Sequence, residues 1–121
     1  MFTILDFTKH NLVAFKVKGK IEKSDYDKLN ALLDKNAREY DAQKVYLEIE
    51  PENIEGLEPQ ALWEDIKTFF KHIRKLEKLA IVGDSSVVEK TTQLSKPFVS
   101  GEVRYFPGNQ AIAAKEWIKK G

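Results

Sequence analysis

Short stretches of the chain alternate between apolar and polar residues, which is the pattern of β-strands that bury one face. The cleanest is "KVYLEIE" (44–50), in which Val45, Leu47 and Ile49 fall on one face. The continuous apolar run "LAIVG" (79–83) is typical of a strand that is buried on both faces of a parallel sheet. Together these patterns predict five strands, over residues 2–7, 12–21, 44–50, 79–83 and 102–106.

Four other stretches repeat their apolar residues every three or four positions, the spacing of one helix face. Ser24 precedes acidic residues at the start of the first stretch, and Asn109 is placed to cap the last one. The third stretch is a poor helix because valine and threonine dominate it. The spacing predicts helices over residues 24–40, 59–76, 85–97 and 109–120.

The order of these elements is β-β-α-β-α-β-α-β-α, which predicts an α/β fold. Strands that alternate with helices form parallel pairs joined by right-handed crossovers. The two first strands follow each other through a short turn at residues 9–11, so the N-terminal strand is expected to be an antiparallel edge strand. The length of 121 residues favours a single domain spanning residues 1–121.

Composition removes several classes of function. The net charge of +1 gives no overall basic field for nucleic acid. The chain has no cysteine, which excludes disulfides and thiolate chemistry. Its N-terminus lacks the charged and apolar regions of a secretory signal, so a cytoplasmic protein is expected, with peripheral contact at the membrane left open.

The opening hairpin, "VKGKIEKSDYDKL" and "KVYLEIE" together resemble the start of a STAS domain, the group that includes an anti-sigma-factor antagonist. The closing "VRYFPGNQAIAAKEWI" resembles the SpoIIAA-like family of small bacterial proteins. The resemblance to this family covers essentially the whole chain. This resemblance implies a STAS-like fold, which is shared with CRAL-TRIO lipid-binding domains. It also implies a non-enzymatic module that binds a protein partner.

Regulatory STAS domains carry a D-S-S-G motif after the third strand, and a partner kinase phosphorylates its serine. The matching place here is "NIEGLEPQ" (53–60), which contains Glu55 and Glu58 but no hydroxyl residue. The triplet Asp84–Ser85–Ser86 comes one strand later, so the resemblance implies no phospho-acceptor in this chain.

Ser85 and Ser86 are interpreted as caps of the helix that follows them. A nucleophilic serine would need a nearby base, and the only histidines are His10 and His72, neither of them placed for it. Asp84 opposes the binding of an anion at this helix start. No spacing of metal ligands or glycine-rich phosphate loop is present, so no cofactor, metal or enzymatic activity is expected.

The predicted helix 59–76 carries an apolar arc wider than the roughly 100° stripe of an ordinary surface helix. We expect a groove between it and segment 86–98 that binds an apolar or lipid-like molecule or a membrane surface. Ordinary core packing and an apolar patch for a protein partner are the alternatives, and a homodimer is also considered. The candidate groove residues are Leu62, Trp63, Ile66, Phe69, Phe70, Val87, Val88, Leu94 and Phe98.

Overall fold

The structure is a computed structural model that describes residues 2–18, 23–50, 64, 67, 75–84 and 86–120. Only the backbone is described for Phe2, Val87 and Phe98. No helix among these residues is both long and apolar enough to cross a membrane. The descriptions below concern these residues.

Five strands form one mixed sheet in the order β1-β2-β3-β4-β5. β1 pairs with β2 antiparallel, and every other neighbouring pair is parallel. This arrangement confirms the predicted fold class, including the antiparallel edge strand. The strands are β1 (Phe2–Ile4), β2 (Leu12–Val17), β3 (Gln43–Ile49), β4 (Leu76–Val82) and β5 (Glu102–Phe106).

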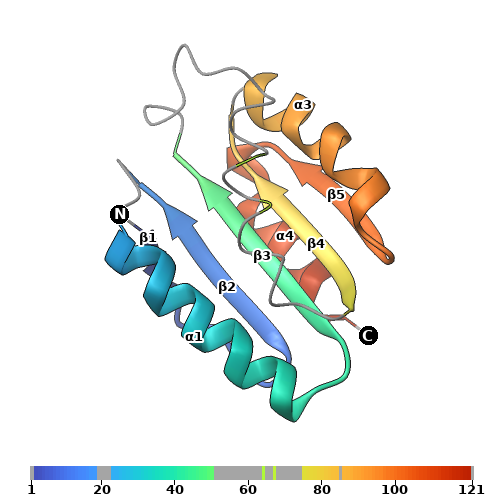
Figure 1. The fold of residues 1–121 in the computed structure, drawn as a ribbon. Coiled ribbons are helices and arrows are strands. Elements are labelled where there is room, and N and C mark those ends of the chain that lie inside the picture. The colour runs from blue at the N-terminus through green and yellow to red at the C-terminus, as the bar shows by residue number, and fades with distance from the viewer. Residues whose placement is uncertain are drawn as a thin grey trace.

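Helices cover both faces of the sheet. Figure 1 shows α1 (Lys23–Glu39) and α3 (Ser86–Ser95) in front of the sheet and α4 (Ala111–Lys119) behind it. Two 3₁₀ turns complete the described elements: η2 (Lys96–Phe98) after α3, and η3 (Gly108–Gln110) before α4.

Alternation along the strands builds two cores, one on each face. On the α1/α3 face, Phe15, Leu47 and Ile81 pack with Leu29 of α1 and Val88 of α3. On the α4 face, side chains of β2 to β5 pack against α4. They are Leu12, Ala14, Tyr46, Ala80, Val82 and Phe106, which meet Ala114 and Ile118.

The boundary between the second predicted helix and β4 is corrected. Leu76 was expected to end the helix, but it begins β4, is 6% exposed and pairs with Gln43. Its three-residue spacing from Ile73 imitates a helix face, whereas parallel pairing with β3 decides the structure. Of the remainder of helix 59–76, the structure describes Glu64, Lys67 and Lys75: Glu64 and Lys67 are helical, and Lys75 is not.

Two predicted helix caps are also corrected. Asn109 lies inside η3 and not at the cap of α4, which begins at Ala111 after Gln110 without a side-chain cap bond. The proline–glycine pair before Asn109 forms a tight turn first, and this turn delays the helix. Ser24 is the second residue of α1 and does not precede it.

Candidate functional site

The predicted apolar groove lies mostly outside the described residues. Val88 is fully buried in the core of the α1/α3 face, and Leu94 is partly buried against the same core. The structure therefore brings these two residues together as core, which leaves the groove itself a prediction. Its other residues lie outside the described part of the chain, Val87 and Phe98 by their side chains: Leu62, Trp63, Ile66, Phe69, Phe70, Val87 and Phe98.

The buried face of α3 is rich in hydroxyl groups, in keeping with the poor apolar pattern of its sequence. Thr91, Thr92 and Ser95 are all buried. Thr92 Oγ1 donates to the carbonyl of Val88 at 2.9 Å, and Ser95 Oγ donates to that of Thr92 at 2.6 Å. These bonds satisfy the hydroxyls inside the helix, so apolar contact with the sheet falls mainly to Val88 and Leu94.

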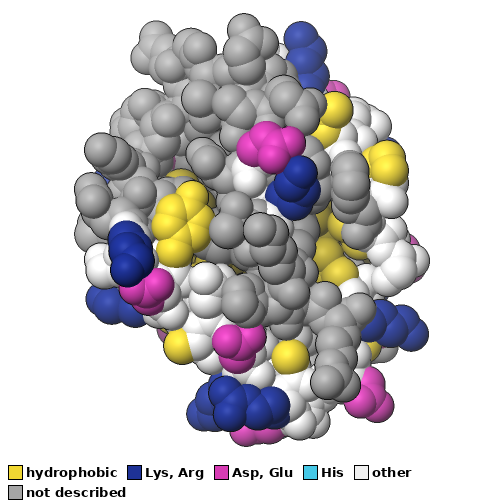
Figure 2. Space-filling view, in the orientation of Figure 1, with side chains coloured by type: hydrophobic (Ala, Val, Ile, Leu, Met, Phe, Trp, Pro, Cys, Tyr) yellow, Lys and Arg dark blue, Asp and Glu magenta, His cyan; other side chains and the backbone are white. Residues whose placement is uncertain are grey.

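Among the described residues, the side chains on the α1/α3 face do not gather into one apolar surface. Figure 2 shows hydrophobic patches that are separate among the described side chains, with acidic and basic groups side by side along the lower rim. This view offers no continuous apolar patch for a partner among the described residues.

Asp84 holds the end of β4 to the turn before α4. Its Oδ1 accepts a hydrogen bond of 2.7 Å from the backbone N–H of Gly108. A Cβ at Gly108 would stand 2.4 Å from the same carboxylate, so only glycine fits there without movement. The carboxylate of the Asp-Ser-Ser triplet thus has a structural role, while Ser86 lies exposed in the first turn of α3 and Ser85 lies outside the described residues.

A small acidic hollow lies at the carboxyl edge of the sheet, where parallel strands commonly present their ligand sites. It encloses about 220 Å³ and is bordered by Glu48, Glu50, Asp84, Gly108 and Ala111. We call it the carboxyl-edge hollow. No local motif in the sequence indicates this hollow, because its walls come from three separate segments that only the fold brings together.

A network of polar side chains fixes the carboxylates of this hollow. Lys16 Nζ lies 2.6 Å from Glu50 Oε1 and 3.2 Å from Glu48 Oε2. Hydrogen bonding to Lys16 lowers the pKa of Glu50 below its usual value, and the two glutamates raise the pKa of Lys16. Tyr46 Oη donates to Glu48 Oε1 at 2.8 Å, and burial, with this bond, raises the pKa of Tyr46. Glu50, paired with Lys16, is therefore ionised at neutral pH.

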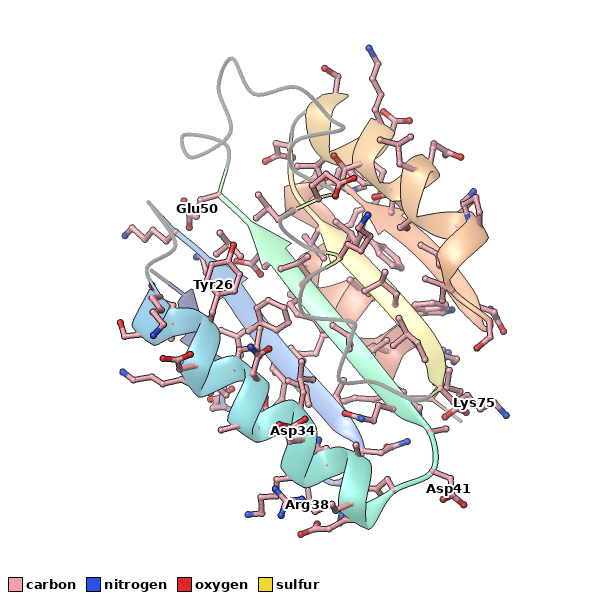
Figure 3. The ribbon with its side chains drawn as sticks, in the orientation of Figure 1. Tyr26, Asp34, Arg38, Asp41, Glu50 and Lys75 are labelled. Atoms are coloured by element: carbon pink, nitrogen blue, oxygen red, sulfur yellow. The ribbon has the colours of Figure 1, made fainter. Side chains whose placement is uncertain are left out.

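An exposed apolar residue lies one position along α4 from Ala111, which borders the hollow. Ile112 follows Ala111 in the first turn of α4 and is 77% exposed. Figure 3 places Glu50 at this carboxyl edge and Lys75 at the opposite end of the sheet.

No group of histidine, aspartate and glutamate residues in the described part of the chain is arranged to hold a metal ion.

The mixed sheet, with two described helices on one face and one on the other, defines a small α/β domain of STAS type. A family model described as SpoIIAA-like matches residues 12–119, and the chain belongs to this family. This finding confirms the resemblance seen in the sequence. Domains of the family are generally non-enzymatic binding or regulatory modules. No curated protein and no solved structure matches the chain significantly.

Proposed function

We propose that this protein is a regulatory module that binds a basic, partly apolar segment of a partner protein at the carboxyl-edge hollow. Membership of the family supports this proposal, because STAS domains typically mediate protein interactions. The observation that carries it is an acidic hollow bordered by Ala111, with the exposed Ile112 next to Ala111 in the first turn of α4. Interfaces commonly combine an apolar anchor with polar groups around it.

The charges of the hollow favour a cationic guest. Glu48, Glu50 and Asp84 bring three carboxylates to its wall, while Lys16 is the cation held against two of them. A lysine or arginine of the partner would meet the remaining negative charge and bond to carboxylate oxygens whose positions are already fixed. Ile112 would pack against an apolar residue next to that cation.

Binding of this kind does not depend on phosphorylation of the chain. The place of the family phosphosite, residues 53–60, contains Glu55 and Glu58 and neither serine nor threonine. A glutamate carries its negative charge permanently at neutral pH, whereas a serine acquires charge only through a kinase. We therefore expect a constitutive interaction, regulated by the amount or state of the partner.

Substitution of Ile112 tests this proposal. We expect Ile112→Glu to abolish capture of the partner from a cell extract and to weaken the purified complex at least about tenfold, as loss of an anchor residue does. Ile4→Glu is the matched control, because Ile4 is the other exposed large hydrophobic residue in the described part of the chain, at 43%, and lies on β1. The captured partner should carry a basic segment, and its Kd should rise with salt.

Equal loss in both isoleucine variants, or binding that Ile112→Glu leaves intact, would contradict the proposal. Light scattering on the purified complex identifies the case in which the partner is a second copy of this chain. The thermal midpoint of each variant separates lost binding from lost folding.

The apolar groove is a second candidate function, and the hydroxyl-rich buried face of α3 favours it. The groove predicted from the sequence lies between α3 and helix 59–76, a segment of which only Glu64, Lys67, Lys75 and Leu76 are described. A helix with little apolar burial can move aside at small cost and admit a ligand between itself and that segment. The groove would use the aromatic residues of helix 59–76, among them Trp63 and Phe70.

Native mass spectrometry of the purified protein and co-sedimentation with liposomes test the groove. We expect a bound lipid that is lost in Trp63→Ala and retained in Trp117→Ala, since Trp117 packs on the α4 face. A protein that carries no lipid and stays in the supernatant would exclude this candidate.

A further inference from the structure

We infer that a cavity at the amino edge of the sheet, on the α4 face, binds a small organic anion with an apolar body. The cavity measures about 410 Å³, within the range of small-ligand sites. Its lining includes the cationic groups Lys9, Lys44 and Lys119, with His10 at the same wall. We call it the amino-edge cavity. It lies at the opposite end of β3 from the carboxyl-edge hollow and is independent of the function proposed above.

Lys44 is the first observation that points to an anion. Lys44 is only 7% exposed, and its Nζ donates to the carbonyl oxygen of Lys120 at 3.0 Å. In the part of the chain that the structure describes, no carboxylate pairs with it. Lysines are rarely buried without a partner of opposite charge. An anion in the cavity would give Lys44 a counter-charge that the described carboxylates do not supply.

Capping of α4 explains only part of this arrangement. Lys78 Nζ already donates to the carbonyl of Lys120 at 2.9 Å and to that of Trp117 at 3.3 Å. A cation at a helix C-terminus is favourable, yet a second buried ammonium on the same oxygen adds repulsion between like charges. An anion in the cavity beside Lys44 would relieve this repulsion.

His10 is the second, independent observation. It sits at the tip of the β1–β2 turn with a backbone φ of 55°, a left-handed conformation that favours glycine. The turn is closed by hydrogen bonds in both directions between Lys9 and Leu12, of 2.9 and 3.0 Å. A non-glycine residue held in a left-handed conformation at a cavity wall is a common mark of a functional position. Here it keeps an imidazole beside the lysines.

The wall that carries His10 is rigid before any ligand arrives. Thr8 Oγ1 donates to the carbonyl of Ala14 at 3.0 Å and accepts its N–H at 2.9 Å. Asn11 Nδ2 donates to the carbonyl of Ala42 at 3.1 Å. Binding to a wall that is already ordered avoids most of the entropy that a loop loses on closing.

The remaining wall is apolar, which defines the body of the ligand. Phe7 and Ile118 line the cavity, and the Phe7 ring stands edge-on to Tyr46 with centroids 5.0 Å apart. Lys119 Nζ lies 5.7 Å from the centre of the Phe7 ring, so charge and apolar surface adjoin. Asp6 is the single carboxylate of the lining, against three lysines. A short-chain carboxylate or a phosphate monoester has the required head and tail.

Titration of the folded protein, followed by amide NMR shifts, tests the inference with hexanoate, inorganic phosphate and the neutral analogue hexan-1-ol. At low, constant ionic strength we expect saturable binding of an anion with a Kd below about 10 mM, and shifts at residues 6–12, 44 and 118–119. Hexanoate alone would assign a carboxylate head and phosphate alone a phosphate head. Hexan-1-ol should bind at least about tenfold more weakly than hexanoate, since it lacks the charge.

Variants at the cavity decide whether its cations are responsible. Lys44→Met keeps the length of the side chain without its charge and should weaken anion binding at least about tenfold, the effect of losing one charged hydrogen bond. Lys119→Met, at an exposed position, should weaken it about threefold or more and covers the case in which Lys44→Met fails to fold. Lys96→Met, at an exposed position in η2, is the matched control and should bind as the parent does.

The inference is overturned if neither anion saturates, or if hexan-1-ol binds as tightly as hexanoate. It is equally overturned if the shifts lie away from the cavity, or if Lys119→Met and a folded Lys44→Met both keep the parent affinity.

Discussion

Two lysines share one carbonyl at the end of α4, and removing them singly and together measures what each contributes. Lys44 and Lys78 both donate to Lys120 O, at 3.0 and 2.9 Å. Lys78 also bonds the carbonyl of Trp117 at 3.3 Å and lies 4.9 Å from the centre of its ring. Substitution of each lysine by methionine keeps the aliphatic stem and removes only the charged donor.

The expected costs differ because the two lysines differ in burial and partners. Lys78→Met loses a carbonyl bond of its own and a cation–π contact, and should cost about 1–2 kcal/mol. Lys44→Met should cost less than about 1 kcal/mol, since it replaces a buried ammonium, which pairs with none of the described carboxylates, by an apolar group. In either single variant, the carbonyl oxygen of Lys120 still accepts a hydrogen bond from the lysine that remains.

The double variant removes both donors and should cost more than the sum of the singles by roughly 0.5–1.5 kcal/mol. Loss of repulsion between the two ammonium groups acts in the same direction, because each single variant gains from it and the double variant gains nothing further. Urea unfolding of the four proteins at one pH and one ionic strength measures the cycle. Additive costs, or a larger cost for Lys44→Met than for Lys78→Met, would refute the reasoning.

Three further changes have definite expected outcomes. His10→Gly should stabilise the protein by about 0.5–1 kcal/mol in urea unfolding, because glycine accepts the φ of 55° without strain. Gly101→Ala should cost at least about 3 kcal/mol or prevent soluble expression, because its Cβ would stand 1.9 Å from the backbone oxygen of Glu77. Glu50→Gln should flatten the loss of stability in acid. Lys16 lowers the pKa of Glu50, so the stability that this ion pair contributes is present above the pKa of Glu50 in the unfolded chain and is lost as pH falls through its pKa in the folded protein.

Each of these changes has a matched control and a contrary result. The control for His10→Gly is Ala113→Gly inside α4, which should destabilise the protein by about 1 kcal/mol. If His10→Gly also destabilised the protein, the turn at His10 would be unstrained. Ser100→Ala, next to Gly101, should stay within roughly 0.5 kcal/mol of the parent. Glu116→Gln, on the exposed face of α4, should leave the acid limb unchanged. If Glu50→Gln also left the loss of stability in acid unchanged, the ion pair between Lys16 and Glu50 would not be its cause.

The elements that the sequence predicted well are those with one dominant signal. "KVYLEIE" alternates without a break, and β3 follows it to within one residue at either end. "EVRYF" coincides with β5. Where two signals overlap, the local one misled: Leu76 continues a helical spacing, but its pairing with Gln43 is a contact between segments far apart in the chain. A single sequence carries no record of that contact.

The candidate sites show the same limit more strongly. The acidic hollow combines Glu48, Asp84 and Gly108, and the cavity combines His10, Lys44 and others, which no local motif connects. Counting strands places the echo of the phosphosite, Asp84–Ser85–Ser86, after the fourth strand, and Asp84 does follow β4. What the count could not supply is the bond from Asp84 to Gly108, because η3 replaced the expected helix start there.

The net charge of +1 conceals a separation of charge between the two ends of the sheet. Glu48, Glu50 and Asp84 lie at the carboxyl edge, and lysines line the cavity at the amino edge. β3 has seven residues, so the edges stand roughly 20 Å apart. That distance is about twice the screening length at ordinary salt, and a charge removed at one edge is scarcely felt at the other. Glu50→Gln should therefore leave hexanoate binding unchanged and Lys119→Met should leave partner binding unchanged, so each variant serves as the folded control for the other site.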